Sequence, residues 1–387
     1  MRDVFKIKDF SELWVNLRRF PSLMSITKEQ VLKALSTVND PDIKRDLVSL
    51  NMIRDVAVSD QAISFTVVLT TPACPLKDLI RRDCEAAVRK VAGDSIAVNI
   101  NMTSSVTTLR DNAPLLPGVK NIIAIASGKG GVGKSTVTTN LAVSLAMAGA
   151  KVGLIDADIY GPSIPVMFNT EKEQPAVKVV NGKNIIIPLE QYGVKLLSIG
   201  FLAPADSAIV WRGPMASSAL KQFISDADWG ELDYLLIDLP PGTSDIHLTL
   251  VQTVPVTGAI IVTTPQKVAL ADATKGVAMF QQPQINVPVL GVVENMAWFT
   301  PEELPDHKYY IFGKDGGLNL AQKFGVPFLG QIPLVQGIRE SGDSGLPAAM
   351  KDGIVGKSFH ELAESVARQI AIRNANFVPS RKVEMNA

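Results

Sequence analysis

Short runs of apolar residues recur along the last two-thirds of the chain, and each run ends in polar or turn-forming residues. They lie at residues 121–127, 151–158, 234–240, 258–265 and 287–295. Longer stretches with helical spacing of apolar positions separate them. Continuous apolar strands that alternate with helices are typical of an α/β fold with a mostly parallel sheet covered by helices on both faces. The ligand site of such a sheet lies outside the carboxyl ends of its strands, so we look there for functional residues.

The chain before residue 103 has a different pattern, which predicts a small α-β-β-α-β domain. Its first helix follows Thr27, and Gln30 stands at capping-box spacing from that residue. Two apolar runs joined by a polar turn then predict a pair of strands. The expected elements after the first helix are strands at 53–58 and 62–69, a helix at 76–91 and a strand at 95–100.

A polar segment with two prolines and a glycine separates the two patterns, and we interpret it as a linker. Met24 offers an alternative start, so the residues before it are treated as an extension. The predicted organisation is an N-terminal extension at 1–24, a small α/β domain at 25–102, a linker at 103–119, a main α/β domain at 120–375 and a tail at 376–387.

A glycine-rich loop connects the first apolar run of the main domain to the next helix. Residues 128–135 read GKGGVGKS and fit the pattern G-x-x-x-x-G-K-[ST] between a strand and a helix. The glycines let backbone N–H groups turn toward phosphate oxygens, and the helix N-terminus adds positive potential. In this pattern Lys134 reaches the β- and γ-phosphates, and Ser135 binds Mg²⁺. The loop therefore predicts a P-loop NTPase; the alternative is a glycine-rich turn without a ligand.

Aspartates stand at the ends of two further apolar runs. Asp238 ends YLLID, where an acidic residue on the Mg²⁺ side of the site is expected. Asp156 and Asp158 end a second run, and we expect Asp156 to join the metal shell and Asp158 to position the attacking water. The turn after Asp238 contains two prolines and Gly242, whose N–H could sense a γ-phosphate. The alternative for each aspartate is a polar residue that merely caps a strand end.

Composition narrows the class of protein further. Lys+Arg and Asp+Glu both number 38, so the formal net charge gives no electrostatic reason to expect nucleic acid or an anionic membrane as a partner. No apolar run approaches about 18 residues, and the N-terminus lacks the apolar core of a signal peptide, which predicts a cytoplasmic protein. Only two cysteines are present, Cys74 and Cys84, which rules out a disulfide framework.

Four segments together resemble the Mrp (ApbC-type) iron–sulfur cluster carrier ATPases. They are GKGGVGKST from residue 128, DADIYGPS from residue 156, DLPPGTSD from residue 238 and VENMAWF from residue 293. The resemblance covers residues 120–370, and those carriers are deviant Walker A ATPases, like the septum-site and plasmid-partition ATPases. The first domain resembles the small domain often fused to bacterial Mrp proteins.

The resemblance implies ATP as the nucleotide and a homodimer as the working form. In relatives, the lysine that matches Lys129 crosses the dimer interface and touches phosphates bound by the other subunit, as an arginine finger does. Asn295 matches the position that contacts adenine. A solvated loop lysine and an ordinary turn residue are the alternatives. The expected catalytic residues are Lys129, Lys134 and Asp158. The expected nucleotide-binding residues are Gly128, Lys129, Gly130, Gly131, Val132, Gly133, Lys134, Ser135, Thr136, Gly242 and Asn295, with Ser135, Asp156 and Asp238 on Mg²⁺.

The sequence departs from these carriers at the cluster site. They usually have a Cys-x-x-Cys shortly after the segment that matches ENM, and two such pairs would supply four thiolates to a bridging [4Fe–4S] cluster. This chain has no cysteine in the main domain, and His307 in the corresponding gap is interpreted as a surface residue. Cys74, just before a helix, is the remaining candidate for a cluster ligand or reactive thiol, with a structural thiol as the alternative. Cys84, inside that helix, is expected to pack inertly.

The expected function is therefore a slow ATPase that assists iron–sulfur cluster assembly and delivers clusters from a scaffold to recipient apoproteins. The alternative is a positioning or partitioning ATPase of the same fold, whose ATP-bound dimer binds a membrane or DNA. The C-terminal helix of mixed charge and the zero net charge argue against that alternative. A redox ATPase like the nitrogenase iron protein needs cluster cysteines in the main domain, which this chain lacks.

Overall fold

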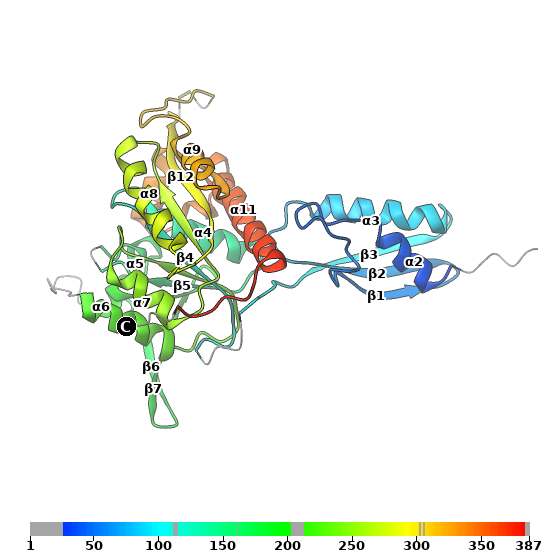
Figure 1. Cartoon of the computed structure of the whole chain (residues 1–387), viewed down its shortest axis with the longest axis horizontal. Helices are drawn as coiled ribbons and strands as arrows, with labels where there is room; N and C mark the ends of the chain where they lie inside the picture. The colour runs from blue at the N-terminus through cyan, green and yellow to red at the C-terminus, as the bar shows by residue number, and fades with distance from the viewer. Residues whose placement is uncertain are drawn as a thin grey trace, which may run out of the picture. The chain divides into compact units, whose positions relative to one another are not determined.

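The computed structural model describes residues 26–110, 115–159, 161–202, 213–301, 303–304 and 306–383 (Figure 1). The extension that we predict at 1–24 and part of the predicted linker lie outside these ranges. The chain divides into two compact units. The smaller unit ends at Leu69, resumes at Leu76 and ends again at Thr103, whereas the larger unit contains Thr70–Pro75 and the chain from Ser104 onward.

The smaller unit has the element order α-β-β-α-β. Its first helix is held by a capping box, in which Thr27 and Gln30 each accept a hydrogen bond from the other's backbone N–H. The strands pair in the order β1-β2-β3, and alternate residues of β2 are buried against the two helices. The elements are α2 (Lys28–Leu35), β1 (Ile53–Val58), β2 (Ala62–Leu69), α3 (Lys77–Ala92) and β3 (Ala97–Ser104).

An eight-stranded sheet forms the centre of the larger unit. Its strand order is β13-β12-β11-β4-β10-β5-β9-β8, and every neighbouring pair is parallel except β8 with β9. The strands are β4 (Val119–Ser127), β5 (Val152–Asp156), β8 (Leu189–Gln191), β9 (Val194–Ser198), β10 (Leu232–Asp238), β11 (Gly258–Thr263), β12 (Val289–Phe299) and β13 (Phe328–Leu334). The mostly parallel α/β fold predicted from the apolar runs is confirmed.

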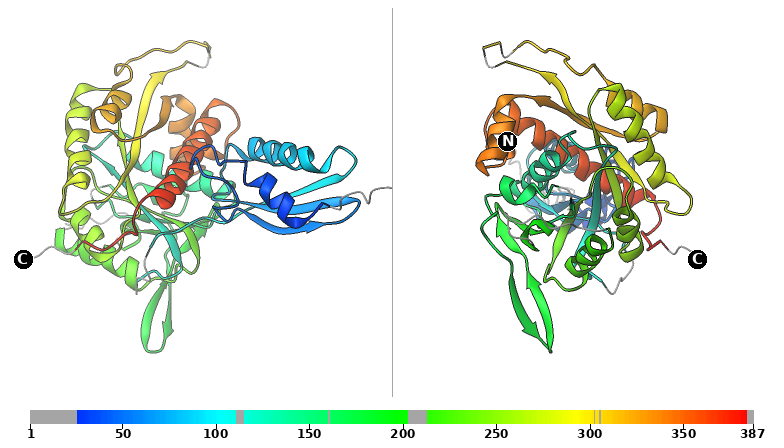
Figure 2. Two further views of the ribbon diagram at one scale, coloured as in Figure 1. Left: turned by 45° about the vertical axis from the view of Figure 1, so that its right-hand side comes forward. Right: turned by 90° about the vertical axis from the view of Figure 1, so that its left-hand side faces the viewer.

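Helices cover both faces of this sheet, because its strands are apolar on both sides (Figure 2). One buried core lies under α6, α7, α8 and α9, and the other lies under α4, α5 and α11. The helices are α4 (Lys134–Met147), α5 (Ile164–Met167), α6 (Gly213–Ser225), α7 (Asp245–Thr253), α8 (Lys267–Gln281), α9 (Gly316–Phe324), α10 (Gln336–Ser344) and α11 (Ile354–Asn376), with short 3₁₀ helices η2 (Ile199–Leu202) and η3 (Ala348–Met350). Within the described residues, no helix has the length and apolar character needed to span a membrane.

Two features of the larger unit were not predicted. A separate hairpin, β6 (Ala176–Val180) with β7 (Lys183–Ile187), projects away from the main sheet (Figure 2). The residues after Ser104 pack onto the unit instead of spanning open solvent: Val106 joins the core, and the guanidinium of Arg110 donates to the carbonyls of Leu115, Leu116 and Val119.

Candidate nucleotide site

The predicted phosphate loop lies between β4 and the N-terminus of α4. Gly131 and Gly133 both have a φ of +79°, a left-handed conformation that residues with a Cβ rarely adopt. Gly133 is the N-cap of α4 and offers no side-chain cap, so the first N–H groups of the helix have no side-chain partner there. Unpaired N–H groups and the helix dipole together favour an anion at this point.

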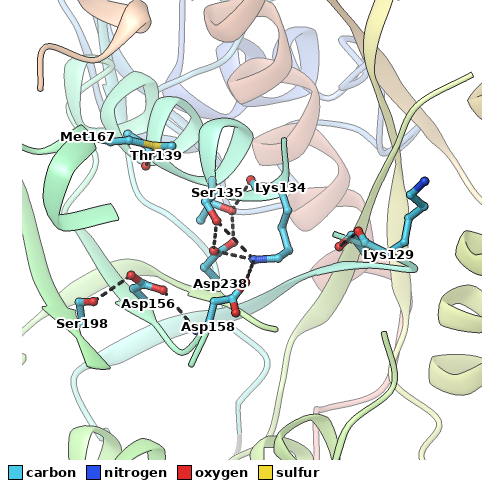
Figure 3. Close-up of polar contacts among 11 residues, drawn as sticks. Lys129, Lys134, Ser135, Thr139, Asp156, Asp158, Met167, Ser198 and Asp238 are labelled. Atoms are coloured by element: carbon cyan, nitrogen blue, oxygen red, sulfur yellow. Dashed lines mark hydrogen bonds and ion pairs between the residues drawn. The ribbon is translucent and has the colours of Figure 1, made fainter. Parts of the chain in front are cut away.

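Lys134 is the centre of a buried cluster of charges at the start of α4 (Figure 3). Its side chain is only 5% exposed, and its Nζ lies 2.7 Å from Asp238 Oδ2 and 3.4 Å from Asp158 Oδ2. Burial alone would lower the pKa of Lys134, but Asp238 and Asp158 outweigh that effect and raise it. The ammonium is therefore charged and lies where the phosphate loop can present it to an anionic ligand.

Asp238 receives hydrogen bonds from two hydroxyl groups of α4 as well. Ser135 Oγ donates to its Oδ2 at 2.6 Å, and Thr138 Oγ1 donates to its Oδ1 at 2.6 Å. Thr138 was not among the predicted site residues. The one sequence signal for Thr138 as a site residue was its position one helical turn after Lys134, on the same face of α4.

Asp156 ends β5 beside Asp238 and is fully buried. Its Oδ2 accepts from Ser198 Oγ at 2.8 Å, and its Oδ1 accepts from the backbone N–H of Asp158 at 3.2 Å. Burial, reinforced by the nearby charge of Asp238, raises the pKa of Asp156 to about 7. Ser198, at the end of the neighbouring strand β9, is a second residue that sequence reasoning missed.

The oxygen donors at these strand ends fit Mg²⁺. Mg²⁺ with a nucleotide commonly uses one or two protein ligands plus phosphates and water, and hydroxyl and carboxylate oxygens are its preferred donors. Ser135 Oγ already donates a hydrogen bond to Asp238 Oδ2. A Mg²⁺ ion placed between the two groups would therefore have both oxygens as ligands. Within the described ranges, no three His, Cys, Asp or Glu side chains form a ready metal cage by themselves.

Asn295 lies on the other side of the loop, at a distortion of β12. Its Nδ2 donates to the carbonyl of Val132 at 2.9 Å. The next residue, Met296, has a φ of +55°, which is strained for a residue with a long side chain and turns the strand locally. A cavity of about 370 Å³ opens beside these residues and is lined by Gly133, Thr136, Asn295, Met296 and part of residues 333–343.

Lys129 belongs to the loop, and Gly242 lies in the turn after Asp238. The Lys129 side chain points away from the Lys134 cluster (Figure 3), and among the described residues it has no hydrogen-bond or ion-pair partner. The N–H of Gly242 donates to the carbonyl of Ser127 at 2.8 Å, so it is engaged within the protein in this structure. A contact between Gly242 and a γ-phosphate would require that bond to break.

The structure does not bring Cys74 to the nucleotide site. Cys74 is half-buried in Thr70–Pro75, where Ala73 joins the core and Thr71 Oγ1 accepts from Tyr234 Oη at 3.3 Å. Tyr234 lies near the start of β10, whereas Asp238 ends that strand, about 13 Å further along. Cys84 is buried in α3, and burial raises the pKa of its thiol to about 12, as expected for a packing role. His307 is exposed and stacks on Tyr309.

Replacing Gly128 by alanine should unfold the loop locally and weaken the fold. An added Cβ would lie 2.1 Å from the backbone carbon of Asp272 and 2.2 Å from the backbone nitrogen of Ala273, both in α8. Because helix backbone cannot move aside like a side chain, we expect Gly128→Ala to lower the free energy of unfolding by about 3 kcal/mol in urea titrations.

Gly130→Ala is the matched control, since its Cβ would approach only Pro241 Cγ, at 3.9 Å. It should unfold at the same urea concentration as the unaltered chain. Equal midpoints for both variants would contradict the close packing of the loop on α8.

Comparisons with known proteins agree with this geometry. A family model described as NUBPL iron-transfer P-loop NTPase matches residues 118–370, and one described as iron–sulfur cluster assembly protein matches residues 28–100. The iron–sulfur cluster carrier protein of Synechocystis sp. is 46% identical over 352 residues, which cover 90% of this chain and 99% of the relative. The carrier protein of Deinococcus radiodurans is 46% identical over 357 residues, covering 91% and 98%.

A solved structure is similar to part of this chain. The ADP complex of a nucleotide-binding protein from Archaeoglobus fulgidus is 40% identical, with a TM-score of 0.51, and the match covers 59% of this chain and 88% of that one. The matched relatives span both units, and the family model spans the phosphate loop and all the carboxylates around it. The chain therefore belongs to the iron–sulfur cluster carrier family of P-loop NTPases, with an N-terminal iron–sulfur cluster assembly domain.

Proposed function

We propose that this carrier hydrolyses ATP slowly, with Mg²⁺, as a cytoplasmic homodimer, and that it takes clusters from a scaffold and delivers them to apoproteins. One observation carries the ATP part of the proposal. The Lys134 ammonium, the Ser135 hydroxyl and the Asp238 carboxylate meet within hydrogen-bond distance at the N-terminus of a helix. Relatives named iron–sulfur cluster carrier proteins, which match along nine-tenths of this chain, support the cargo. Two cysteines without a disulfide suit a reducing compartment.

In the proposed reaction, the buried charges exchange partners when ATP binds. Lys134 leaves Asp238 and Asp158 for the β- and γ-phosphates, which are stronger acceptors because they carry more charge. Ser135 and Asp238 would hold Mg²⁺, with Asp156 supporting the same site, and the ion would supply positive charge to the phosphate oxygens. Asp158, released from Lys134, accepts a hydrogen bond from the attacking water and orients it in line with the γ-phosphate.

The adenine base fits the cavity beside Asn295. Apolar side chains from α5, β12 and α10 supply stacking surface there, and Asn295 offers both a donor and an acceptor to the base edge. One of the two amide N–H groups of Asn295 donates to the carbonyl of Val132, so the residue that would contact the base also contacts the phosphate loop. Lys129, which points out of its own site, would serve the site of a second copy.

Cys74 is the candidate cluster ligand of this chain. The thiol of Cys74 is half-buried, so it remains within reach of a partner, whereas Cys84 is enclosed. Two subunits would contribute only two Cys74 thiolates, and a [4Fe–4S] cluster takes four. We therefore propose that any cluster on this chain is held jointly with thiolates from a donor or recipient protein.

Anaerobic reconstitution with iron and sulfide tests that assignment. With a small thiol compound present in place of the partner's thiolates, we expect a labile cluster on the unaltered chain, detected by its visible absorption and by iron and sulfide per dimer. We expect its loss in Cys74→Ser, because a serine hydroxyl is a poor ligand for iron. Cys84→Ser is the matched control and should keep the cluster. A cluster that survives in Cys74→Ser would remove Cys74 from the proposal, while leaving the ATPase site untouched.

A further inference from the structure

Ser127, the last residue of β4, makes two hydrogen bonds that reach different parts of the nucleotide site. Its backbone carbonyl accepts the N–H of Gly242 at 2.8 Å. Its Oγ donates to the backbone carbonyl of Lys129 at 3.0 Å. Ser127 is 1% exposed, whereas Lys129 and Gly242 are each partly buried. One buried residue thus contacts both the turn after Asp238 and the lysine that points out of the site.

The bond from Gly242 continues the pairing of β10 with β4 past the end of the strand. Leu239 N–H donates to the carbonyl of Ile125 at 3.0 Å, as in the regular ladder. Pro240 and Pro241 have no N–H, so Gly242 supplies the next donor. Its φ of +84° lets the chain turn back toward β4 at that point. In the sensor turn, residues 239–244, the N–H of Gly242 is therefore the donor that reaches the residue directly before the phosphate loop.

The same N–H group is the one that a γ-phosphate would attract. A phosphate oxygen is an anionic acceptor, and hydrogen bonds to charged acceptors are stronger than those to a peptide carbonyl. The carbonyl that Gly242 would release belongs to the peptide unit between Ser127 and Gly128. That unit directly precedes Lys129, and Gly128 packs without clearance against α8. Because Gly128 has no room to shift toward α8, we expect a rotation of the Ser127 carbonyl to move the backbone of Lys129.

We propose that Ser127 is a positioning residue that couples the sensor turn to Lys129, so that Lys129 is presented to a second copy of the chain when a γ-phosphate is bound. Its hydroxyl fixes the Lys129 backbone, and its carbonyl responds to Gly242. This inference rests on the proposed function, in which Lys129 acts across a dimer. Ser127 is not among the residues to which we assign contacts with the nucleotide or Mg²⁺.

Steady-state ATPase kinetics on the full chain test the coupling. We expect Ser127→Ala to lower kcat about three- to tenfold, the cost of one buried hydrogen bond, and to leave KM and ADP affinity within about twofold. Ser127→Thr restores the hydroxyl and should recover kcat. Ser144→Ala is the control, because it removes an equally buried hydroxyl of α4 that has no partner in the described structure.

A double-mutant cycle separates coupling from a general loss of structure. Because Ser127 acts through Lys129, Ser127→Ala should have no further effect on kcat in a Lys129→Ala background. An equal loss in both backgrounds, or an unchanged kcat in Ser127→Ala alone, would overturn the inference. If Ser127→Ala unfolds at a lower temperature than the unaltered chain, Ser127→Cys is measured instead, because its side chain has a similar shape and a weaker donor. Normal turnover in Lys129→Ala would instead refute the dimer mechanism, and the role of Ser127 with it.

Discussion

Lys134→Ala is expected to abolish measurable ATP hydrolysis, with a loss of at least about a hundredfold in kcat. The ammonium lies at the N-terminus of α4, where the phosphates are expected, and its Nζ is 2.7 Å from Asp238 Oδ2. A phosphoryl group that gathers negative charge during transfer would lose its nearest positive charge. Phosphate release, followed over hours at high protein concentration, measures the residual rate.

The substitution also removes the cation that balances three neighbouring carboxylates, so stability must be measured beside activity. Breaking a buried pair costs about 3–5 kcal/mol when one charge is left without a partner. Lys134→Gln, which still donates to Asp238, should retain more of the stability while remaining inactive. Lys275→Ala removes an exposed lysine paired with Asp272 on α8 and should behave like the unaltered chain. Robust turnover in Lys134→Ala would mean that the phosphate loop is not the hydrolytic site.

Lys129→Ala is expected to lower kcat by about a hundredfold or more while leaving ADP binding to a single subunit nearly unchanged. Its side chain points away from Lys134 and has no partner among the described residues, so it contributes little to its own site. A cation supplied by a second subunit makes hydrolysis depend on assembly. The unaltered chain should therefore show a specific activity that rises with protein concentration.

Mixing two inactive variants gives the sharpest form of this test. A heterodimer of Lys129→Ala with Lys134→Ala has one complete site, built from Lys134 of one subunit and Lys129 of the other. The mixture should regain part of the activity that each variant lacks alone. If the mixture stays inactive while both variants bind ADP and associate with ATP, Lys129 does not act in trans.

The parts of this protein that could be predicted from sequence depend on local chemistry. The phosphate loop was predictable because Gly131 and Gly133 adopt left-handed conformations that other residues avoid. The parallel sheet was predictable because its strands are buried on both faces and read as continuous apolar runs. The meeting of Asp156 and Asp238 at one edge of the sheet was predictable for a related reason, since the carboxyl ends of parallel strands share an edge.

The contacts that were missed depend on pairings between distant segments. Ser198 reaches Asp156 because β9 lies next to β5, an order that no local pattern encodes. The acceptor of the Gly242 N–H follows from the register of β10 on β4 and not from the turn sequence. The hairpin of β6 and β7 was missed because its alternation is weak and its first strand is wholly exposed.

The division of the chain has a consequence for how the protein can be shortened. The larger unit is discontinuous in sequence, since Thr70–Pro75 belongs to it although residues of the smaller unit lie on both sides. A fragment that begins at β4 would lack Ala73 and Val106 from its core. It would also lack the guanidinium of Arg110, which donates hydrogen bonds to three backbone carbonyls. The larger unit therefore needs a six-residue segment that precedes most of it in sequence, and a truncation at the apparent domain boundary would remove residues of its own core.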